Sequence, residues 1–159
     1  GVVQGPIIDQ QGFDKIERHI ADATAKGGVV VTGGKPHEKG GTFYQPTVLT
    51  GATRDMQLFS EETFGPVAAL FKFDKEEDAI AAANDTIFGL AAYFFTKDVS
   101  RIFRVSEALE YGMVVSNTGA YSSEVGAFGG VKASGLGREG SKYGIDEFME
   151  IKLMVIGGV

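Results

Sequence analysis

Apolar residues recur at helical spacing near the start of the chain. Between residues 9 and 26 they fall three or four positions apart, so a helix would carry them on one face. Asp9 can cap the start of this helix and Gly27 can end it. The residues on the predicted apolar face are Phe13, Ile16, Ile20 and Ala23.

Short apolar runs alternate with further helical patterns along the chain. The run at 29–32 is β-branched and apolar throughout, which is typical of a strand buried on both faces. Asp74 with Glu77 forms a possible capping box for a helix reaching about residue 84. The alternation indicates parallel βαβ units and an α/β fold. Further strands are predicted at 43–49, 67–73, 90–96 and 113–115, and another helix at 98–111.

The pattern changes after residue 116. Residues 117–144 are rich in glycine and serine and exceed the length of an ordinary connection, and such loops usually carry function. Residues 150–156 begin with alternating polar and apolar positions and end apolar on both sides. Such a strand needs a partner sheet, either within the chain or on another subunit.

Composition narrows the classes of partner. The chain has 159 residues, a length at which we expect one ordinary core. A net charge of −6, with acidic and basic residues interspersed, predicts no nucleic-acid partner. No run approaches the roughly 20 apolar residues that span a bilayer, so we expect no membrane partner and a soluble, cytoplasmic protein.

Cysteine is absent, which excludes disulfides, thiolate metal sites and a cysteine nucleophile within these residues. His19 lies one helical step from the predicted apolar face and His37 lies in a polar stretch. Neither has a histidine or carboxylate at ligand spacing, so we predict no metal site. Lys132, Arg138 and Glu139 lack the setting of a phosphate-binding loop, and we expect them to form ion pairs or subunit contacts.

Two segments carry candidate chemistry: EETFGP at residues 61–66 and FGGVKASGLGRE at residues 128–139. In the first, a carboxylate could accept hydrogen bonds from two vicinal hydroxyls, and the aromatic side chain could pack against a flat ring. Spacing alone favours a simpler interpretation, a solvated acidic turn followed by a phenylalanine of the core.

Both segments resemble signatures of the aldehyde dehydrogenase family, in the order that this family shows. Residues 5–9, 44–47 and 84–90 also resemble family landmarks, and five matches in order are specific where one glycine-rich loop is not. The resemblance implies that residues 1–146 are the second half of the catalytic α/β domain. It also implies that residues 147–159 form an oligomerisation strand, which makes the protein a homo-oligomer.

The resemblance assigns the cofactor contacts to the first segment. Glu62 is the match for the carboxylate that binds the nicotinamide ribose hydroxyls, and Phe64 for the ring that contacts the nicotinamide. Glu61 has no such role, and we expect it to be solvated or locally paired. The cofactor is NAD or NADP, bound mainly by a domain outside this sequence, so the choice between them stays open.

The resemblance assigns the substrate contacts to the glycine-rich region. Phe128 matches an aromatic wall of the aldehyde pocket, with core packing as the alternative. Ser122 matches a serine of the succinate-semialdehyde branch that helps to hold the distal carboxylate, although residue type alone suggests an ordinary loop serine. The sequence departs from the family at Ala127, where proline is usual, so the entry to the loop is less rigid.

The implied reaction is oxidation of succinate semialdehyde to succinate through a cysteine nucleophile. Because the chain has no cysteine and begins at Gly1 with residues typical of a loop interior, we expect it to be part of a longer protein and inactive alone. We predict no catalytic residue within it. Two alternatives stay open: a dehydrogenase for another short semialdehyde, such as glutarate semialdehyde, and a non-enzymatic α/β assembly module.

Overall fold

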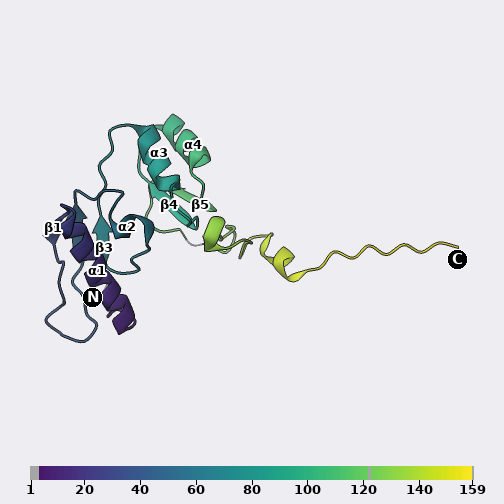
Figure 1. Ribbon diagram of the computed structural model, residues 1–159. Coiled ribbons are helices and arrows are strands. Elements are labelled where there is room, and N and C mark those ends of the chain that lie inside the picture. The colour runs from purple at the N-terminus through teal and green to yellow at the C-terminus, as the bar shows by residue number, and fades with distance from the viewer. Residues whose placement is uncertain (1–3, 122, 159) are drawn as a thin grey trace. The chain divides into compact units, whose positions relative to one another are not determined.

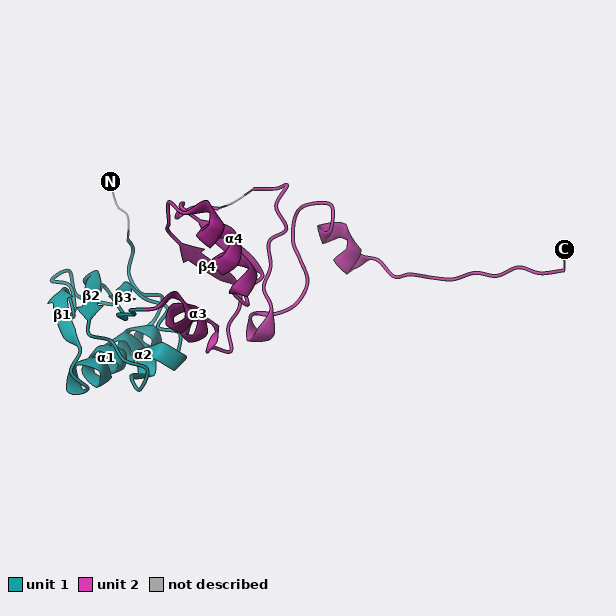
Figure 2. Cartoon of the chain, turned by 90° about the horizontal axis from the view of Figure 1, so that it is seen from above, with its two compact units in different colours: residues 1–74 teal, residues 75–159 magenta. Residues whose placement is uncertain are grey.

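A computed structural model describes residues 4–121 and 123–158. The chain divides into two compact units, Gly1–Asp74 and Lys75–Val159 (Figure 2). Each unit combines helices with strands, and each contains one parallel strand pair. The predicted α/β class is therefore confirmed, while the boundary at residue 146 stays a prediction.

The first unit is built on helix α1 (Gln10–Ala25), as predicted (Figure 1). Asp9 caps it, because its side-chain oxygen accepts a hydrogen bond of 2.8 Å from the backbone N–H of Gly12. The buried face of α1 meets residues of the sheet and its connections in two apolar clusters. Ile7, Ile16, Ile20 and Tyr44 form one cluster, and Ala23, Leu49, Ala52 and Met56 form the other.

Three strands form the sheet of this unit in the order β1 (Val29–Thr32), β2 (Thr47–Thr50), β3 (Val67–Ala69). β2 and β3 run parallel, with Thr47 opposite Val67. The short helix α2 (Gln57–Ser60) lies between them in sequence. The strands cover less of the chain than the predicted ranges 43–49 and 67–73, because residues 43–46 contain only the single bridge at Tyr44 and residues 70–73 form no regular structure.

The prediction that 29–32 is buried on both faces is wrong. β1 lies at the end of the strand order and pairs antiparallel with β2, so its outer side has no neighbouring strand in this unit. Val29 is 59% exposed and Val31 is 62% exposed. The apolar run therefore predicted a strand correctly, but its position within the sheet incorrectly.

The second unit follows the predicted alternation closely. Helix α4 (Val99–Ala108) connects strands β4 (Ala91–Phe94) and β5 (Met113–Ser116), which pair in parallel from Ala91–Met113 to Phe94–Ser116. Asp98 caps α4 by accepting a hydrogen bond from the backbone N–H of Arg101 at 3.3 Å. This is the βαβ arrangement that strands separated by one helix predict.

Helix α3 (Glu76–Asn84) precedes β4, but the predicted capping box is wrong. The helix begins one residue later than expected, so Lys75 occupies the cap position and makes no side-chain capping bond. Asp74 instead lies 3.5 Å from the ammonium group of Lys72. The first turn of α3 is stabilised by its acidic residues, since these carboxylates face the positive end of the helix dipole.

Beyond β5 the backbone is mostly irregular, with two 3₁₀ turns, η1 (Lys132–Ser134) and η2 (Gly144–Phe148). Residues 149–158 form neither helix nor strand (Figure 1). Ile151, Leu153 and Val155 are all more than four-fifths exposed. The predicted strand at 150–156 therefore has no partner within the described part of the chain, and pairing with another subunit stays a prediction.

Glu76 on α3 binds two arginines of α4. This contact should make the stability of the fold depend on pH. Its carboxylate accepts hydrogen bonds of 2.6 Å from both Arg104 and Arg101. The Arg104 bond first, and the Arg101 bond second, lower the pKa of Glu76 from 4.5 to about 2. Because the folded pKa lies below the unfolded one, this stabilising contribution is complete above about pH 4.5 and is lost as the pH falls towards 2.

We expect Glu76→Gln to flatten the acid limb of the stability curve. Denaturation midpoints measured from pH 7 to pH 2 should fall less steeply between pH 4.5 and 2 in Glu76→Gln than in the wild type. Glu77→Gln, one residue along the same helix, is the control and should keep the wild-type slope. Parallel curves for Glu76→Gln and the wild type would contradict this assignment.

Candidate functional site

The acidic segment lies between α2 and β3, on an irregular stretch of the first unit. Phe64 is 81% exposed and has a positive φ of 49°, in the left-handed region that non-glycine residues seldom occupy. Holding a phenylalanine there costs about 1–3 kcal/mol, and such strain concentrates at ligand sites. The ring is therefore not the core phenylalanine of the simpler interpretation.

The two glutamates of the segment have different surroundings. Glu61 lies 3.3 Å from Arg18 and 3.1 Å from His19. The hydrogen bond from His19 first, and that from Arg18 second, lower the pKa of Glu61 below its ordinary value. The expectation that Glu61 is locally paired is confirmed. The carboxylate of Glu62 is exposed and has no hydrogen-bond or ion-pair partner among residues 4–121 and 123–158, so it is free to accept from a ligand.

Helix α1 packs against this segment and forms hydrogen bonds with it. A Cβ at position 65 would overlap the side chain of Ile16, so glycine lets the backbone approach α1 closely there. His19 is wholly buried and lies on the same face as Ile16, Ile20 and Ala23, which corrects its predicted place beside the apolar stripe. The spacing 16, 19, 20, 23 held the signal for this burial. Its contact with the carboxylate of Glu61 was hidden by 42 residues of sequence separation.

Phe128 occupies a defined position in the second unit. Its backbone N–H donates to the carbonyl of Glu139 at 2.9 Å, and the N–H of Glu139 donates back at 2.7 Å. This antiparallel bridge closes the glycine-rich segment 128–139 into a loop. Phe128 is 43% exposed, so its ring is available to a ligand and does not belong to the core.

Side chains inside and beside the loop hold it in place. Arg138 donates from one guanidinium nitrogen to the carbonyls of Gly130 at 2.8 Å and Gly137 at 2.7 Å. Ser134 accepts a hydrogen bond from the backbone N–H of Gly89 at 2.9 Å. Lys132 forms a 2.7 Å ion pair with Glu110, as expected for a structural role.

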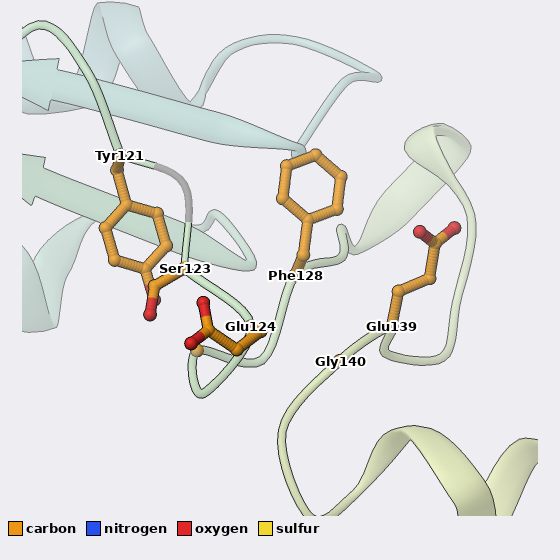
Figure 3. A pocket seen from close by; sticks show the side chains of 7 residues that line it. Tyr121, Ser123, Glu124, Phe128, Glu139 and Gly140 are labelled. Carbon is orange, nitrogen blue, oxygen red and sulfur yellow. The ribbon is translucent and has the colours of Figure 1, made fainter.

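A hollow of about 520 Å³ lies beside Phe128 (Figure 3). Carboxylates, a phenol and an aromatic ring face it, so its wall is partly polar and partly apolar. A second hollow of about 340 Å³ also borders Phe128. Ser122, the predicted carboxylate ligand, lies outside the described residues. The lining residues of the first hollow are Tyr121, Ser123, Glu124, Gly126, Phe128, Glu139 and Gly140.

The predicted site residues fall into two groups. Glu62 and Phe64 lie together in the first unit, and Phe128 lies in the second. Among the residues that the structure describes, no three metal-binding side chains gather. No helix in those same ranges is long and apolar enough to cross a membrane.

Comparison with known proteins identifies the family. The family model described as "Aldehyde dehydrogenase family" matches residues 1–154, nearly the whole chain. The chain belongs to the aldehyde dehydrogenase family. The resemblance carried by the five sequence landmarks is thereby confirmed, and the family's members are oxidoreductases.

Several relatives act on semialdehydes by name. The chain is 61% identical over 157 residues to the NADP-dependent succinate-semialdehyde dehydrogenase GabD of Escherichia coli, covering 99% of the chain and 33% of that protein. It is 56% identical over its whole length to a glutarate-semialdehyde dehydrogenase of Pseudomonas aeruginosa, covering 33% of that protein. A 3-sulfolactaldehyde dehydrogenase of Pseudomonas putida is 54% identical, again over 33% of its length. The chain spans about a third of these relatives.

Solved structures of aldehyde dehydrogenases share the fold. An NADP-dependent enzyme of Escherichia coli matches with a TM-score of 0.95 and 61% identity, over 98% of this chain and 32% of that one. A succinate-semialdehyde dehydrogenase of Burkholderia pseudomallei matches with a TM-score of 0.91 and 58% identity, over 93% of this chain and 31% of that one. The irregular loops described above therefore belong to a recurring architecture.

The Arg138 contacts predict how the glycine-rich loop responds to mutation. Arg138→Met keeps the side-chain length but removes the donors to Gly130 and Gly137. Since hydrogen bonds from charged groups contribute about 1.5–3 kcal/mol, amide exchange in residues 128–139 should accelerate by roughly 10- to 100-fold. Hydrogen exchange followed by mass spectrometry measures this. Lys142→Met, a charge removal nearby, should leave the rate unchanged, and equal rates in Arg138→Met and the wild type would contradict the role given to Arg138.

Proposed function

We propose that the chain is part of an NAD(P)-dependent dehydrogenase that oxidises succinate semialdehyde to succinate. The observation that carries this proposal is the EETFGP segment, in which one glutamate is anchored while Glu62 and Phe64 are left free and exposed. A solvated acidic turn gives no reason to hold a phenylalanine in the left-handed region. High identity to named succinate-semialdehyde dehydrogenases supports the substrate.

Glu62 and Phe64 suit a nicotinamide riboside. An unpaired carboxylate can accept from both hydroxyls of a ribose, and an exposed ring can pack against a flat heterocycle. When bound, the cofactor supplies the hydride acceptor for aldehyde oxidation. Glu62 orients the ribose and Phe64 limits where the ring can lie. NADP appears in the name of the GabD relative, whereas a betaine aldehyde dehydrogenase of Staphylococcus aureus was solved with NAD+, so both cofactors remain candidates.

The hollow beside Phe128 is the proposed aldehyde-binding pocket, and the ring of Phe128 is its aromatic wall. The ring offers a flat apolar surface for the short carbon chain of a semialdehyde. Ser122 has a hydroxyl that can donate to the substrate's distal carboxylate, assisted by a cation from elsewhere in the protein. Ala127 enters this loop without the rigidity of proline.

The reactive groups come from outside these 159 residues in this proposal. The chain has no cysteine, so a thiolate that attacks the carbonyl must be supplied by another part of the protein. The same holds for a general base and for donors to the oxyanion. The chain alone then provides binding surfaces without a nucleophile, and we expect it to be inactive. A cytoplasmic location and a homo-oligomer joined through residues 147–159 complete the proposal.

Glutarate semialdehyde is the second candidate substrate. It differs from succinate semialdehyde by one methylene, and relatives named for the two substrates are 56% and 61% identical to the chain. One methylene in an apolar pocket changes specificity by about 10- to 200-fold, so the kinetics of the full-length protein can separate the two.

The cofactor role predicts the effect of two substitutions in the full-length protein. Glu62→Gln weakens the acceptor, and Phe64→Ala removes the ring. Each should raise the dissociation constant of NADH or NADPH by about tenfold, the equivalent of one lost contact of about 1.4 kcal/mol. Fluorescence titration measures this constant. Glu38→Gln, an exposed carboxylate in another loop, is the control, and unchanged affinity in both test variants would refute the proposed cofactor site.

The substrate role predicts a selective effect of Ser122→Ala. The Michaelis constant for succinate semialdehyde should rise about five- to tenfold, since a hydrogen bond to a carboxylate is lost. The constant for butyraldehyde, which lacks that carboxylate, should not change, and Ser100→Ala, at an exposed position on α4, should affect neither. An unchanged constant for succinate semialdehyde would show that Ser122 does not bind the carboxylate. A wild-type preference for glutarate semialdehyde would favour the second candidate.

A further inference from the structure

His19 is a buried polar residue with two partners on one loop. Its side chain has no exposed surface and lies among Ile16, Ile20 and Ala23 on α1. Burying an imidazole is unfavourable unless its nitrogens are hydrogen-bonded. Nδ1 lies 3.0 Å from Oγ1 of Thr63, and Nε2 lies 3.1 Å from Oε2 of Glu61. Both nitrogens are therefore used on the segment that precedes β3.

The two partners alternate with the two free residues. Glu61 and Thr63 contact α1, whereas Glu62 and Phe64 are exposed. Glu61 has extended backbone, with φ −99° and ψ 129°, and successive side chains of an extended chain point to opposite sides. Fixing position 61 therefore turns position 62 away from the helix, and fixing position 63 anchors the backbone next to Phe64, whose ring is exposed from a left-handed conformation.

The geometry points to His19 as a positioning residue that clamps Glu61 and Thr63 to helix α1 and thereby presents Glu62 and Phe64 to the nicotinamide cofactor. This inference rests on the proposed function for its ligand, but the clamp itself is a feature of the first unit. His19 touches no ligand in this arrangement and acts only through the loop.

The chemistry of the clamp is directional. A carboxylate only accepts hydrogen bonds, so Nε2 of His19 carries a proton and donates to Glu61. Nδ1 then accepts from the hydroxyl of Thr63 in the neutral ring, or donates to the same oxygen in the charged ring. The two contacts are thus compatible with either protonation state of His19.

Other contacts to this segment are more exposed. Arg18 reaches Glu61 at 3.3 Å and Gln57 at 3.3 Å, but its side chain is 53% exposed, so solvent screens it. Gly65 adds close packing against Ile16 without a directional bond. Among these contacts, His19 alone combines full burial with two hydrogen bonds to the segment.

The test uses the full-length dehydrogenase and variants that separate the clamp from simple core filling. His19→Leu keeps a side chain of similar size in the core but removes both bonds. His19→Gln keeps a donor and an acceptor on one planar group. Thr63→Val removes one partner with little change of shape. The control is His37→Leu, since His37 lies in a polar loop and contacts Phe43 instead.

We expect His19→Leu to raise the dissociation constants of NADH and NADPH by roughly tenfold, the effect of misplacing one or two ligand contacts. The Michaelis constant for the aldehyde at saturating cofactor should stay near the wild-type value. His19→Gln should recover most of the cofactor affinity, and Thr63→Val should lose about threefold. The double variant His19→Leu/Thr63→Val should bind no more weakly than His19→Leu, because both substitutions break the same clamp.

Three outcomes would overturn the inference: wild-type cofactor affinity in His19→Leu, additive losses in the double variant, or equal losses in His19→Gln and His19→Leu. If His19→Leu does not fold, Thr63→Val and His19→Gln carry the test, and wild-type affinity in Thr63→Val then overturns it. Failure of the proposed function looks different, since Glu62→Gln and Phe64→Ala would then leave cofactor affinity unchanged. If Glu62→Gln and Phe64→Ala weaken cofactor binding while His19→Leu does not, the inference about His19 is wrong and the proposed function stands.

Discussion

A buried imidazole held between a carboxylate and a hydroxyl joins helix α1 to the irregular segment that carries the proposed cofactor contacts. The helix α1 is fixed by apolar packing of Ile16, Ile20 and Ala23, and His19 shares that face. The loop that carries Glu62 and Phe64 has little apolar packing of its own. Its geometry therefore derives from the helix, through the hydrogen bonds of His19 and Arg18 and one glycine contact.

The exposed phenylalanine makes this support necessary. The left-handed backbone of Phe64 is unfavourable, and its ring, which is 81% exposed, contributes little burial to offset that cost. It persists only where neighbouring contacts determine the backbone on both sides. Thr63 is anchored before it, and Gly65 packs against Ile16 after it. Preorganising an aromatic surface in this way lowers the entropic cost of binding a flat ligand.

In the second unit, hydrogen bonds to the backbone hold the loop that carries Phe128. Phe128 is fixed by a reciprocal pair of hydrogen bonds with Glu139, and Arg138 holds the intervening glycines through their carbonyls. Glycine is required where backbone meets backbone, as at Gly129, whose Cβ would overlap the carbonyl of Gly137. In both units an irregular loop thus presents an aromatic side chain: helix α1 supports the first loop, and hydrogen bonds within the loop support the second.

Local patterns predicted the elements well, and long-range contacts explain the failures. The helix at α1, its cap at Asp9 and the parallel pair β4–β5 follow from residues close in sequence. The exposure of β1 depends on its place at a sheet edge, and the hydrogen bonds of His19 reach a loop more than 40 residues away. Neither feature can be predicted from the spacing of residues along the sequence. The roles of Glu62, Phe64, Ser122 and Phe128 came from resemblance, because their residue types alone favoured ordinary surface or core positions.

A crystal structure of the full-length dehydrogenase with NADP+ bound tests the cofactor assignment most directly. We expect the carboxylate of Glu62 to lie within hydrogen-bond distance of the nicotinamide ribose hydroxyls, with the Phe64 ring against the nicotinamide. The bonds from His19 to Glu61 and Thr63 should remain at about 3 Å. A cofactor bound with its ribose away from Glu62, or a loop released from His19 in the complex, would contradict this account.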